Sequence, residues 1–434
     1  MATAEDASNP ESVSISPLLR RLAYPEASQI EVSAGEIASA FALIFEDRLS
    51  VIQTAALLTL LHSTGKDRES DVLALCANRM RDAAMQVERA PLKKLIKERR
   101  RREGLYRGGL CDIVGTGGDS HSTFNISTTS SIIASPLLLV GKHGNRAQTS
   151  FSGSADVLTS ITPTPPNISA VRAENVAKVF EKTNYAFLFA PNYHPGMMYA
   201  NPVRRGLGIR TIFNLLGPLA NPIDWAIEAR VVGVAYQSLG PVFAEALRLS
   251  GSKRALVICG EEDLDEVSCA GKTNCWRLSE YPNPAYKPPE DEQEDEDCST
   301  CEDDSEPRTL VKLDTFQLQA SDFGLPSHPL SEVGGGKGPR ENAQKLMSLL
   351  RNELPRDDPI LHFVLMNVAA LLVTSGVCEA DTSNMGLGDT GEVIKERGPG
   401  DGRWKEGVRR ARWAIESGEA VNCLEKFIEV SNSL

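Results

Sequence analysis

The sequence predicts an α/β protein in which a small N-terminal helical domain precedes a larger α/β domain with a central mixed or parallel sheet. Apolar residues recur at helical spacing between residues 30 and 105, as on the buried faces of helices. From Leu110 onward, short apolar runs alternate with loops and helical stretches, which is the pattern of strands joined by crossovers. A chain of 434 residues is long enough for two or more packing units.

Capping signals mark the first helices. An S-x-x-E capping box begins at Ser33, ahead of apolar residues at helical intervals, and Ser50 repeats the signal. Gly65 supplies a stop, and a third helix is predicted from near Ser70. We therefore expect a helical domain over residues 29–105, with contributions from helices later in the chain.

Residues 1–28 are rich in Ser, Asn and Pro and lack an apolar stretch flanked by basic residues. This composition matches neither a secretory signal nor a typical transit peptide. It predicts a loose N-terminal arm, of which residues 17–23 are able to dock. No run of eighteen apolar residues occurs in the sequence, so no membrane span is expected.

The predicted α/β domain covers residues 106–434. Five short apolar runs are the expected strands, at residues 110–114, 137–140, 187–190, 231–235 and 255–259. A hairpin is expected over 267–280, and closing helices are expected at 341–350, 360–374 and 404–417. Two segments interrupt this pattern, 281–308 and 381–402, and both are expected to be disordered surface loops.

The formal charge of −12 is concentrated in one place. Residues 281–308 hold eleven acidic residues against two basic ones, which leaves the rest of the chain near −3. The basic run at 93–102 has no interleaved aromatic residues and is best explained as a solvated helix face or a linker. The charge distribution therefore argues against nucleic-acid binding.

Nine cysteines are dispersed along the chain. An odd, scattered set in a large chain indicates a reducing compartment, so a cytoplasmic protein is expected. Cys298 and Cys301 form the only CxxC pair. A zinc site would need two further ligands nearby, and none is evident, which favours a loop with two thiols.

Two glycine-rich polar loops follow the first two predicted strands. The first contains Gly115, Gly117, Gly118 and Asp119. It is neither a Walker A loop nor a dinucleotide fingerprint, and alone it is also compatible with an ordinary strand-to-helix turn. Backbone N–H groups of glycine loops can close on an anion. Two such loops in a short stretch therefore predict a ligand with two anionic ends.

Small polar side chains follow the first loop. Asn125, Ser127 and Thr128 stand at a predicted helix start, where they can cap the helix or hold a phosphate at its N-terminus. Ser127 can also offer an oxygen to a metal. Capping alone would not require the adjacent glycine loop, so this arrangement favours phosphate binding.

The second loop concentrates hydrogen-bond donors after a strand. Lys142 is suited to a phosphate contact, whereas neutral His143 and Asn145 are suited to a planar polar ligand. A metal role for His143 is weak because no second His lies at ligand spacing. The alternative interpretation is a polar surface turn.

Two further clusters carry chemistry. Asp265 and Glu266 follow the strand at 255–259, and adjacent carboxylates that both point inward usually hold a hard cation. A solvated acidic turn is the alternative. Arg204 can bind a substrate carboxylate or pair with a neighbouring one, and His194 is equally compatible with a structural role.

Together these segments resemble the anthranilate phosphoribosyltransferase family. The matching pieces are GTGGDSHSTFNIST at 115–128, KHGNRAQTSFSGSADVL at 142–158, HPGMMYANPVRRGLGIRTIFNLLGPLANP at 194–222 and EEDLDEVS at 261–268. The helical N-terminal region and residues 404–428 look similar too. The resemblance covers most of residues 30–434 outside the two insertions.

The resemblance implies a fold shared with the pyrimidine nucleoside phosphorylases, usually a homodimer, and a role in tryptophan biosynthesis. It implies the substrates 5-phosphoribosyl 1-diphosphate and anthranilate, with Mg²⁺ held by Ser127, Asp265 and Glu266. Anthranilate would be positioned by His143, Asn145 and Arg204, with His194 nearby. The remaining residues expected to bind substrate are Gly115, Gly117, Gly118, Asp119, Thr123, Asn125, Ile126, Ser127, Thr128, Lys142, Arg146 and Ser154.

The implied reaction displaces diphosphate from C1 of the ribose by the amine of anthranilate, with no side chain required as acid or base. Two rivals are a nucleoside phosphorylase of the same fold and a non-catalytic relative that binds nucleic acid. Asp265 and Glu266 oppose the first rival, which needs no paired metal carboxylates. The near-neutral remainder of the chain opposes the second. On any role of the acidic insertion in regulation, the sequence is silent.

Overall fold

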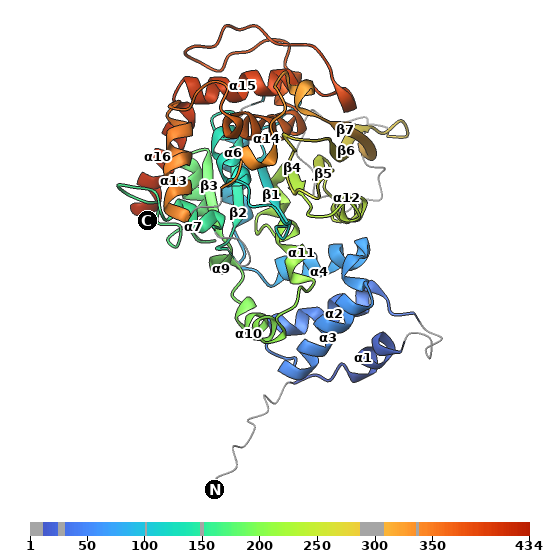
Figure 1. Ribbon diagram of the computed structural model, residues 1–434. Helices are drawn as coiled ribbons and strands as arrows, with labels where there is room; N and C mark the ends of the chain where they lie inside the picture. Colours follow the sequence, from blue (N-terminus) through green and yellow to red (C-terminus); the bar gives the residue numbers. More distant parts are fainter. Residues whose placement is uncertain (1–11, 25–30, 100–101, 148–151, 287–307, 336–337) are drawn as a thin grey trace, which may run out of the picture.

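A seven-stranded mixed sheet forms the centre of the larger domain in the computed structural model (Figure 1). The structure describes all residues except 1–11, 25–30, 100–101, 148–151, 287–307 and 336–337. The strand order is β3-β2-β1-β4-β5-β6-β7. The bounds are β1 Leu110–Gly115, β2 Leu139–Gly144, β3 Tyr185–Phe189, β4 Ile227–Gly233, β5 Ala255–Gly260, β6 Thr273–Pro282 and β7 Thr309–Leu318.

Five of the strands are parallel and two are antiparallel. β3, β2, β1, β4 and β5 run in one direction, while β6 and β7 form a hairpin that pairs with β5. The chain moves from β1 to β2 on one side and returns to β4 on the other, so the strand order reverses between β1 and β4. In open α/β sheets, ligands bind at the carboxyl ends of strands at such a switch point.

The five predicted strands are all present, with one shift that matters for the site. The second begins at Leu139 rather than at residue 137 and continues to Gly144. Lys142 and His143 therefore lie in β2 and are buried, whereas a polar loop was expected there. The expected hairpin over 267–280 is also shifted, because β6 pairs with β7 across the acidic insertion.

Helices cover the two faces of this sheet. α6 (Ile126–Ala134), α14 (Pro359–Ser375) and α15 (Trp404–Glu416) contact one another, and α6 and α14 pack on β1. α12 (Leu239–Leu249) packs on β5 and β6 and also contacts the helical domain. The remaining helices of the larger domain are α5 Arg89–Arg99, α7 Ser154–Leu158, α8 Val176–Lys182, α9 Ala190–Tyr193, α13 Pro339–Leu350 and α16 Glu419–Asn432.

The helical domain lies below the sheet-containing domain in Figure 1. It comprises α1 Ser16–Ala23, α2 Ala34–Phe45, α3 Val51–Ser63 and α4 Ser70–Asp82. The predicted capping box is present, because the Ser33 side chain accepts from the N–H of Glu36 and the Glu36 side chain accepts from the N–H of Ser33. Gly65, with φ of 76°, ends α3 as expected. Two later helices, α10 (Met197–Leu207) and α11 (Phe213–Leu216), contact α2, α3 and α4.

The N-terminal segment docks through α1, which packs on α3. The backbone N–H of Ile15 donates to Oε1 of Gln53 at 2.8 Å. Leu18 and Leu22 are buried. Residues 17–23 thus lie against the bundle, while residues 1–11 fall outside the described part.

The segment 381–402 differs from the expected disordered loop, because the structure describes all of it. The Asp389 carboxylate accepts from Ser383 Oγ at 2.7 Å, from the N–H of Met385 at 2.8 Å and from Arg409 at 3.0 Å. Ile394 N–H donates to Glu406, which is fully buried on α15. These partners come from α15, which local glycine-rich composition does not reveal. The acidic insertion lies mostly outside the described residues.

In the part of the chain that is described, no helix combines the length and apolar character that crossing a bilayer requires.

Candidate functional site

A cavity of about 490 Å³ lies between the carboxyl ends of β1 and β2 and the helical domain. Its walls come from the β1 loop, the end of β2, the start of α6, and α10 and α11, which lie at the junction of the two domains in Figure 1. Predicted residues that line it are Gly115, Gly117, Gly118, Ser127, Lys142, His143, Asn145, Arg146, Ser154, His194 and Arg204. Predicted residues outside its lining are Asp119, Thr123, Asn125, Ile126, Thr128, Asp265 and Glu266.

The β1 loop turns through two left-handed glycines. Gly117 and Gly118 have φ of 64° and 83°, a conformation that costs other residues free energy. The N–H of Gly117 donates to Oδ2 of Asp265 at 2.7 Å. Arg210 donates to the carbonyl oxygens of Gly118 and Gly117 at 3.2 and 3.3 Å, so this loop is held by side chains from two distant segments.

The start of α6 brings a helix N-terminus to the cavity. Ser127 lies in the first turn of α6 and lines the wall, where helix N–H groups favour an anion. Asn125 makes no side-chain cap bond. Its amide instead donates to Ser152 O and accepts from Asn342, both at 2.9 Å. Asn125 therefore links the start of α6 to the second loop and to α13 rather than capping α6.

Two other predicted residues act behind the wall. Thr128 is buried, and its hydroxyl donates to Oγ of Ser154 at 2.8 Å. This bond fixes the hydroxyl of Ser154, which itself lines the cavity. Ile126 is buried in the hydrophobic core. Thr128 thus positions a wall residue, and Ile126 anchors the first turn of α6.

Lys142 is a buried cation beneath the cavity. Its ammonium donates to the carbonyl of Ile113 at 2.8 Å, and its side chain is 1% exposed. Burial lowers the pKa of Lys142, and the charge of Asp112 opposes that shift. Asp112 is held by Asn221 at 2.9 Å. The charge on Lys142 is therefore supported by a buried carboxylate on the neighbouring strand, which makes a solvated surface turn the wrong description.

The second loop is braced through Asp156. Arg146 donates to Oδ1 of Asp156 at 3.1 Å, and the N–H of Gly153 donates to Oδ2 at the same distance. The Asn145 side chain accepts from the N–H of Arg146 at 2.8 Å. These bonds hold Asn145 and Arg146 at the rim of the cavity.

Two histidines pack against each other on the wall. The rings of His143 and His194 are 5.2 Å apart, edge to face. Burial lowers the pKa of His143 well below its usual value and lowers that of His194 to about 4. Nε2 of His194 lies 3.0 Å from the carbonyl of Ala220 and so carries the proton. Both rings are neutral near pH 7 and offer flat surfaces with weak polarity.

Arg204 projects from α10 into the same cavity. Its guanidinium lies over the Phe213 ring, 5.3 Å from the centroid, and donates to Asn201 at 3.4 Å. Partial burial lowers the pKa of Arg204, although a guanidinium stays charged at neutral pH. The aromatic ring and the guanidinium together form a surface that suits a flat carboxylate.

Three half-buried carboxylates, Asp119, Asp265 and Glu266, adjoin the β1 loop. Burial, together with the charge of Asp119, raises the pKa of Asp265 to about 7. Burial, together with the charges of Asp265 and Asp119, raises the pKa of Glu266. Burial also raises the pKa of Asp119. One oxygen of Asp119 and one of Glu266 lack a hydrogen-bond partner in the described structure. Carboxylates that repel one another and leave buried oxygens unpaired are the kind of site that a divalent cation stabilises.

The carboxylates are not a preformed cage. Within the described residues, no three His, Cys, Asp or Glu side chains converge as a metal-ligand set. Thr123 opposes the rise in the pKa of Glu266, and Ser127 faces the cavity from α6. The donor chemistry thus fits a hard cation, and the roles of Ser127, Asp265 and Glu266 as ligands stay predictions.

The sequence did not identify several wall residues. These are Met80, Val114, Thr116, Gly144, Ala147, Gly153, Ala190, Pro191, Pro195, Met197, Met198, Asn201, Arg210, Phe213, Asn214, Gly217 and Pro218. Arg210 lies within the motif at residues 194–222, but its contact with the β1 loop depends on the path of the chain through α10. Met80 comes from α4, so only the docking of the two domains reveals it.

Comparison with known proteins places the chain among glycosyl transferases. Residues 107–286 and 305–421 match the family described as "Glycosyl transferase family, a/b domain". Residues 16–84 match "Glycosyl transferase family, helical bundle domain". The predicted architecture, a small helical domain and a larger α/β domain, is confirmed by these matches and by the sheet.

Curated relatives share one name. The anthranilate phosphoribosyltransferase of Schizosaccharomyces pombe is 35% identical over 91% of this chain and 91% of its own length. That of Saccharomyces cerevisiae is 34% identical over 75% of this chain and 73% of its own length. That of Herpetosiphon aurantiacus is 34% identical over 93% of this chain and 96% of its own length.

Solved structures agree with the sequence relatives. The Saccharomyces cerevisiae enzyme in complex with PRPP and Mg superposes with a TM-score of 0.73 at 29% identity, covering 97% of this chain and 99% of that one. The same enzyme in complex with 4-fluoroanthranilate gives a TM-score of 0.71 at 28% identity, with the same coverage.

Proposed function

Since the chain belongs to the anthranilate phosphoribosyltransferase family, we propose that it transfers the 5-phosphoribosyl group of 5-phosphoribosyl 1-diphosphate to anthranilate. The bond between ribose C1 and the diphosphate oxygen breaks, a bond from the amine nitrogen to C1 forms, and the amine loses a proton. The products are N-(5-phosphoribosyl)anthranilate and diphosphate, as one step of tryptophan biosynthesis.

The observation that carries this proposal is the juxtaposition of two unlike surfaces in one cavity. One surface is the anion-binding side, with the β1 glycine loop, the first turn of α6 and buried Lys142. The other is the aromatic and guanidinium side, with His143, His194 and Arg204. A phosphorylated sugar fits the first and an aromatic carboxylate fits the second, so the cavity is built to bring these two molecules together.

Substrate positioning is assigned residue by residue. We assign the phosphate groups to Gly115, Gly117, Gly118, Ser127, Lys142 and Ser154, and the carboxylate of anthranilate to Arg204. Neutral His143 and His194 flank the aromatic ring. Holding a weakly nucleophilic amine in line with C1 lowers the barrier by proximity and orientation, so no side chain needs to act as a nucleophile.

Mg²⁺ fits the half-buried carboxylates beside this cavity. Asp265 and Glu266, with Ser127 and with Asp119 nearby, would hold it. When bound, the ion supplies positive charge for the departing diphosphate. The N–H groups of the α6 N-terminus stabilise the same developing charge in a fixed geometry, while the N–H of Gly117 is held by Asp265.

The direct test follows the fluorescence of anthranilate in the presence of 5-phosphoribosyl 1-diphosphate and MgCl₂. We expect the fluorescence to fall with time only when all three are present and the protein is active. Uracil or thymidine with inorganic phosphate serves as the probe for the rival nucleoside phosphorylase. Turnover of thymidine without turnover of anthranilate would contradict the proposal.

We further propose a homodimer formed through the helical domain. Val51 and Ile52, at the start of α3, are 68% and 81% exposed, and adjacent apolar side chains at such exposure are typical of an interface. Sedimentation equilibrium of the protein and of its Ile52→Glu variant tests this, with a dimer expected for the first and a monomer for the second.

We also propose that the protein works in the cytoplasm. The seven cysteines in the described part of the chain are all buried free thiols, which suits a reducing compartment. Localisation of the tagged protein by microscopy tests this, and no nucleic-acid partner is expected.

A further inference from the structure

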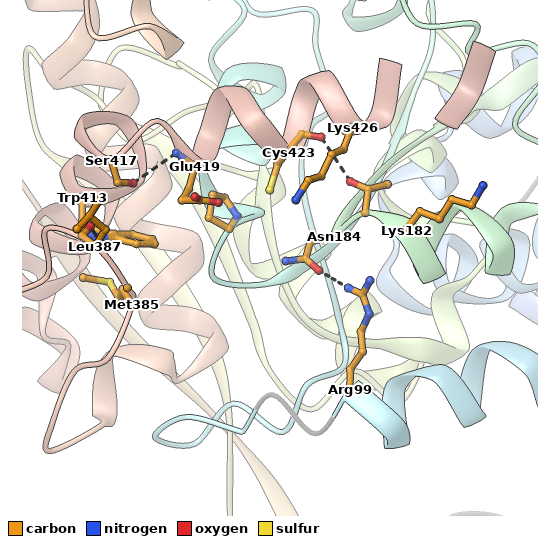
Figure 2. Close-up of a pocket in the computed structure, with 13 residues that line it drawn as sticks. Arg99, Lys182, Asn184, Met385, Leu387, Trp413, Ser417, Glu419, Cys423 and Lys426 are labelled. Carbon is orange, nitrogen blue, oxygen red and sulfur yellow. Dashed lines mark hydrogen bonds between the residues drawn. The ribbon is translucent and has the colours of Figure 1, made fainter. Parts of the chain in front are cut away.

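A second cavity, of about 410 Å³, lies at the amino-terminal end of β3 (Figure 2). Thr183 and Asn184, which immediately precede β3, form its floor. The carboxyl end of β3 leads instead to Ala190 and Pro191 at the substrate cavity. The length of a strand therefore separates the two cavities, and the proposed catalytic residues do not reach the second one.

Positive charge dominates one end of this cavity. Arg99, Lys182 and Lys426 line it, against one acidic residue, Glu419. The Arg99 guanidinium donates to Oδ1 of Asn184, and in Figure 2 the ammonium of Lys426 points toward the same asparagine.

The lysines of this cavity have no acidic partner. Among the residues that the structure describes, neither Lys182 nor Lys426 has a carboxylate within 4.0 Å of its ammonium. Lys182 extends outward at the rim in Figure 2. This end of the cavity thus presents the guanidinium of Arg99, the ammonium of exposed Lys426 and the side-chain amide of Asn184, which is a donor set suited to an anion.

Apolar side chains form the other end. Met385 and Trp413 are 8% and 7% exposed, and Figure 2 shows them grouped with Leu387. The indole N–H of Trp413 donates to the carbonyl of Leu387 at 3.0 Å, so the rest of the ring is left as an apolar surface. Asp389 accepts from the N–H of Met385 at 2.8 Å. This wall is therefore fixed by hydrogen bonds.

We propose that this cavity binds a small organic anion. Its carboxylate or phosphate group would meet Arg99, Lys426 and the amide of Asn184, and its apolar body would lie against Trp413 and Met385. Single-ring ligands suit a cavity of this size. A purely inorganic anion would leave the apolar end without contacts, and a cation would meet like charge.

Methionine methyl groups provide a separate probe for each cavity. Met385 lines this one, while Met80, Met197 and Met198 line the substrate cavity. The protein is labelled with ¹³C-methyl methionine, Met385 is assigned from the Met385→Leu spectrum, and phenyl phosphate or benzoate is titrated. We expect the Met385 resonance to shift in a saturable way at ligand concentrations of about 1 mM.

The binding mode is tested with two variants and two further probes. Lys426→Gln should weaken the binding reported by Met385 about tenfold. Lys178→Gln, which removes an exposed lysine of α8 outside the cavity, should leave it unchanged. Inorganic phosphate has only the anionic group of the proposed ligand, and benzyl alcohol has only its apolar ring. Each should bind about tenfold more weakly than phenyl phosphate.

Three results would overturn the proposal. The first is a Met385 resonance that does not move with either aromatic anion up to about 20 mM. The second is equal affinity in Lys426→Gln and in the unsubstituted protein. The third is inorganic phosphate that binds as tightly as phenyl phosphate. Unchanged Met197 and Met198 resonances in Lys426→Gln would show that the variant is folded.

Discussion

At the residue scale, we propose that recognition of the aromatic substrate depends most on Arg204. It lies over Phe213 on the wall of the substrate cavity, while the nearby histidines are kept neutral by burial. A carboxylate that enters this side therefore finds its positive charge mainly at Arg204. The phosphate side has a different source of charge, since Lys142 is buried and supported by Asp112.

We predict that Arg204→Ala chiefly raises the KM for anthranilate. Loss of a hydrogen bond to a charged group costs about 1.5–3 kcal/mol, which corresponds to an increase in KM of roughly 10–100-fold. Arg205→Ala is the matched control, because Arg205 is exposed on the same helix and does not line the cavity. Steady-state kinetics at saturating diphosphate substrate provide the measurement, and an unchanged KM would remove Arg204 from this role.

Asp265 and Glu266 allow a second test, in which the effect of a substitution on activity is separated from its effect on stability. We predict that Asp265→Asn combined with Glu266→Gln abolishes both the Mg²⁺ dependence and most of the turnover. The same substitution removes repulsion between buried charges, so the melting temperature should stay the same or rise. Activity against MgCl₂ concentration and thermal unfolding are measured side by side. Retained turnover would refute the metal assignment.

At the scale of single elements, helix ends could be predicted from the sequence because capping depends on residues close together in the chain. The capping box at Ser33 and the stop at Gly65 depend on neighbouring residues and are present as predicted. The burial of Lys142 was missed because a strand with a lysine and a histidine looks polar, and only pairing with β1 and β3 buries it. The partners of 381–402 were missed for the same reason, since they come from α15.

The site was likewise predicted only in part, where sequence motifs mark its residues. Its glycine loop, first helical turn and histidines came from motifs and do line one cavity. Met80 and Arg210 line the cavity through long-range placement, Met80 from α4 of the helical domain and Arg210 from the segment after α10, and local sequence signals do not reveal that placement. Asn125 illustrates the limit most clearly, because its type and position indicate a cap, while its amide instead bonds Ser152 in the second loop and Asn342 in α13.

The β1 loop allows a matched test of these long-range contacts. Gly117 and Gly118 both have positive φ, so an alanine at either position costs roughly 1–2 kcal/mol in backbone strain. A Cβ on Gly118 would overlap the Arg210 guanidinium, whereas a Cβ on Gly117 would meet no atom within 4 Å. We predict that Gly118→Ala lowers kcat/KM for 5-phosphoribosyl 1-diphosphate at least about tenfold more than Gly117→Ala. Equal losses in the two variants would contradict the role of Arg210.

At the scale of the whole molecule, one hydrophobic core continues across the boundary between the two domains. One hydrophobic cluster contains Phe41 and Leu58 of the helical bundle together with Val232 and Val257 of the sheet. α12 and α4 make the connection. Because one core spans both parts, loosening the bundle should destabilise the sheet as well.

We predict a single unfolding transition that Phe41→Ala shifts as a whole. Phe41 is fully buried and packs 4.9 Å from Phe213, so its truncation should cost about 3–5 kcal/mol. All four tryptophans lie outside residues 16–84, at positions 225, 276, 404 and 413. Their fluorescence in urea should therefore report the full loss of stability. An unshifted fluorescence midpoint, with early loss of helical circular dichroism, would show that the bundle unfolds alone.

The substitution Leu75→Ala, at a partly exposed position, serves as the control for that experiment. Leu75 lies on the same bundle and is 38% exposed, so its truncation should change the free energy of unfolding by much less than that of Phe41. A comparable shift in both variants would mean that the bundle responds to any substitution rather than to loss of the shared core.

The hairpin of β6 and β7 has a consequence for how this chain tolerates change in length. β6 starts beside Gly260 and ends at Pro282, and β7 begins opposite it at Thr309. The connection between them therefore leaves the sheet at the end opposite to the carboxyl ends of the parallel strands, where the substrate cavity lies. Closing a flexible connection of twice the length costs only about 0.6 kcal/mol. Extra residues, even strongly charged ones, can accumulate or be deleted at this point, and a fluorescent or affinity module inserted there should leave catalysis intact.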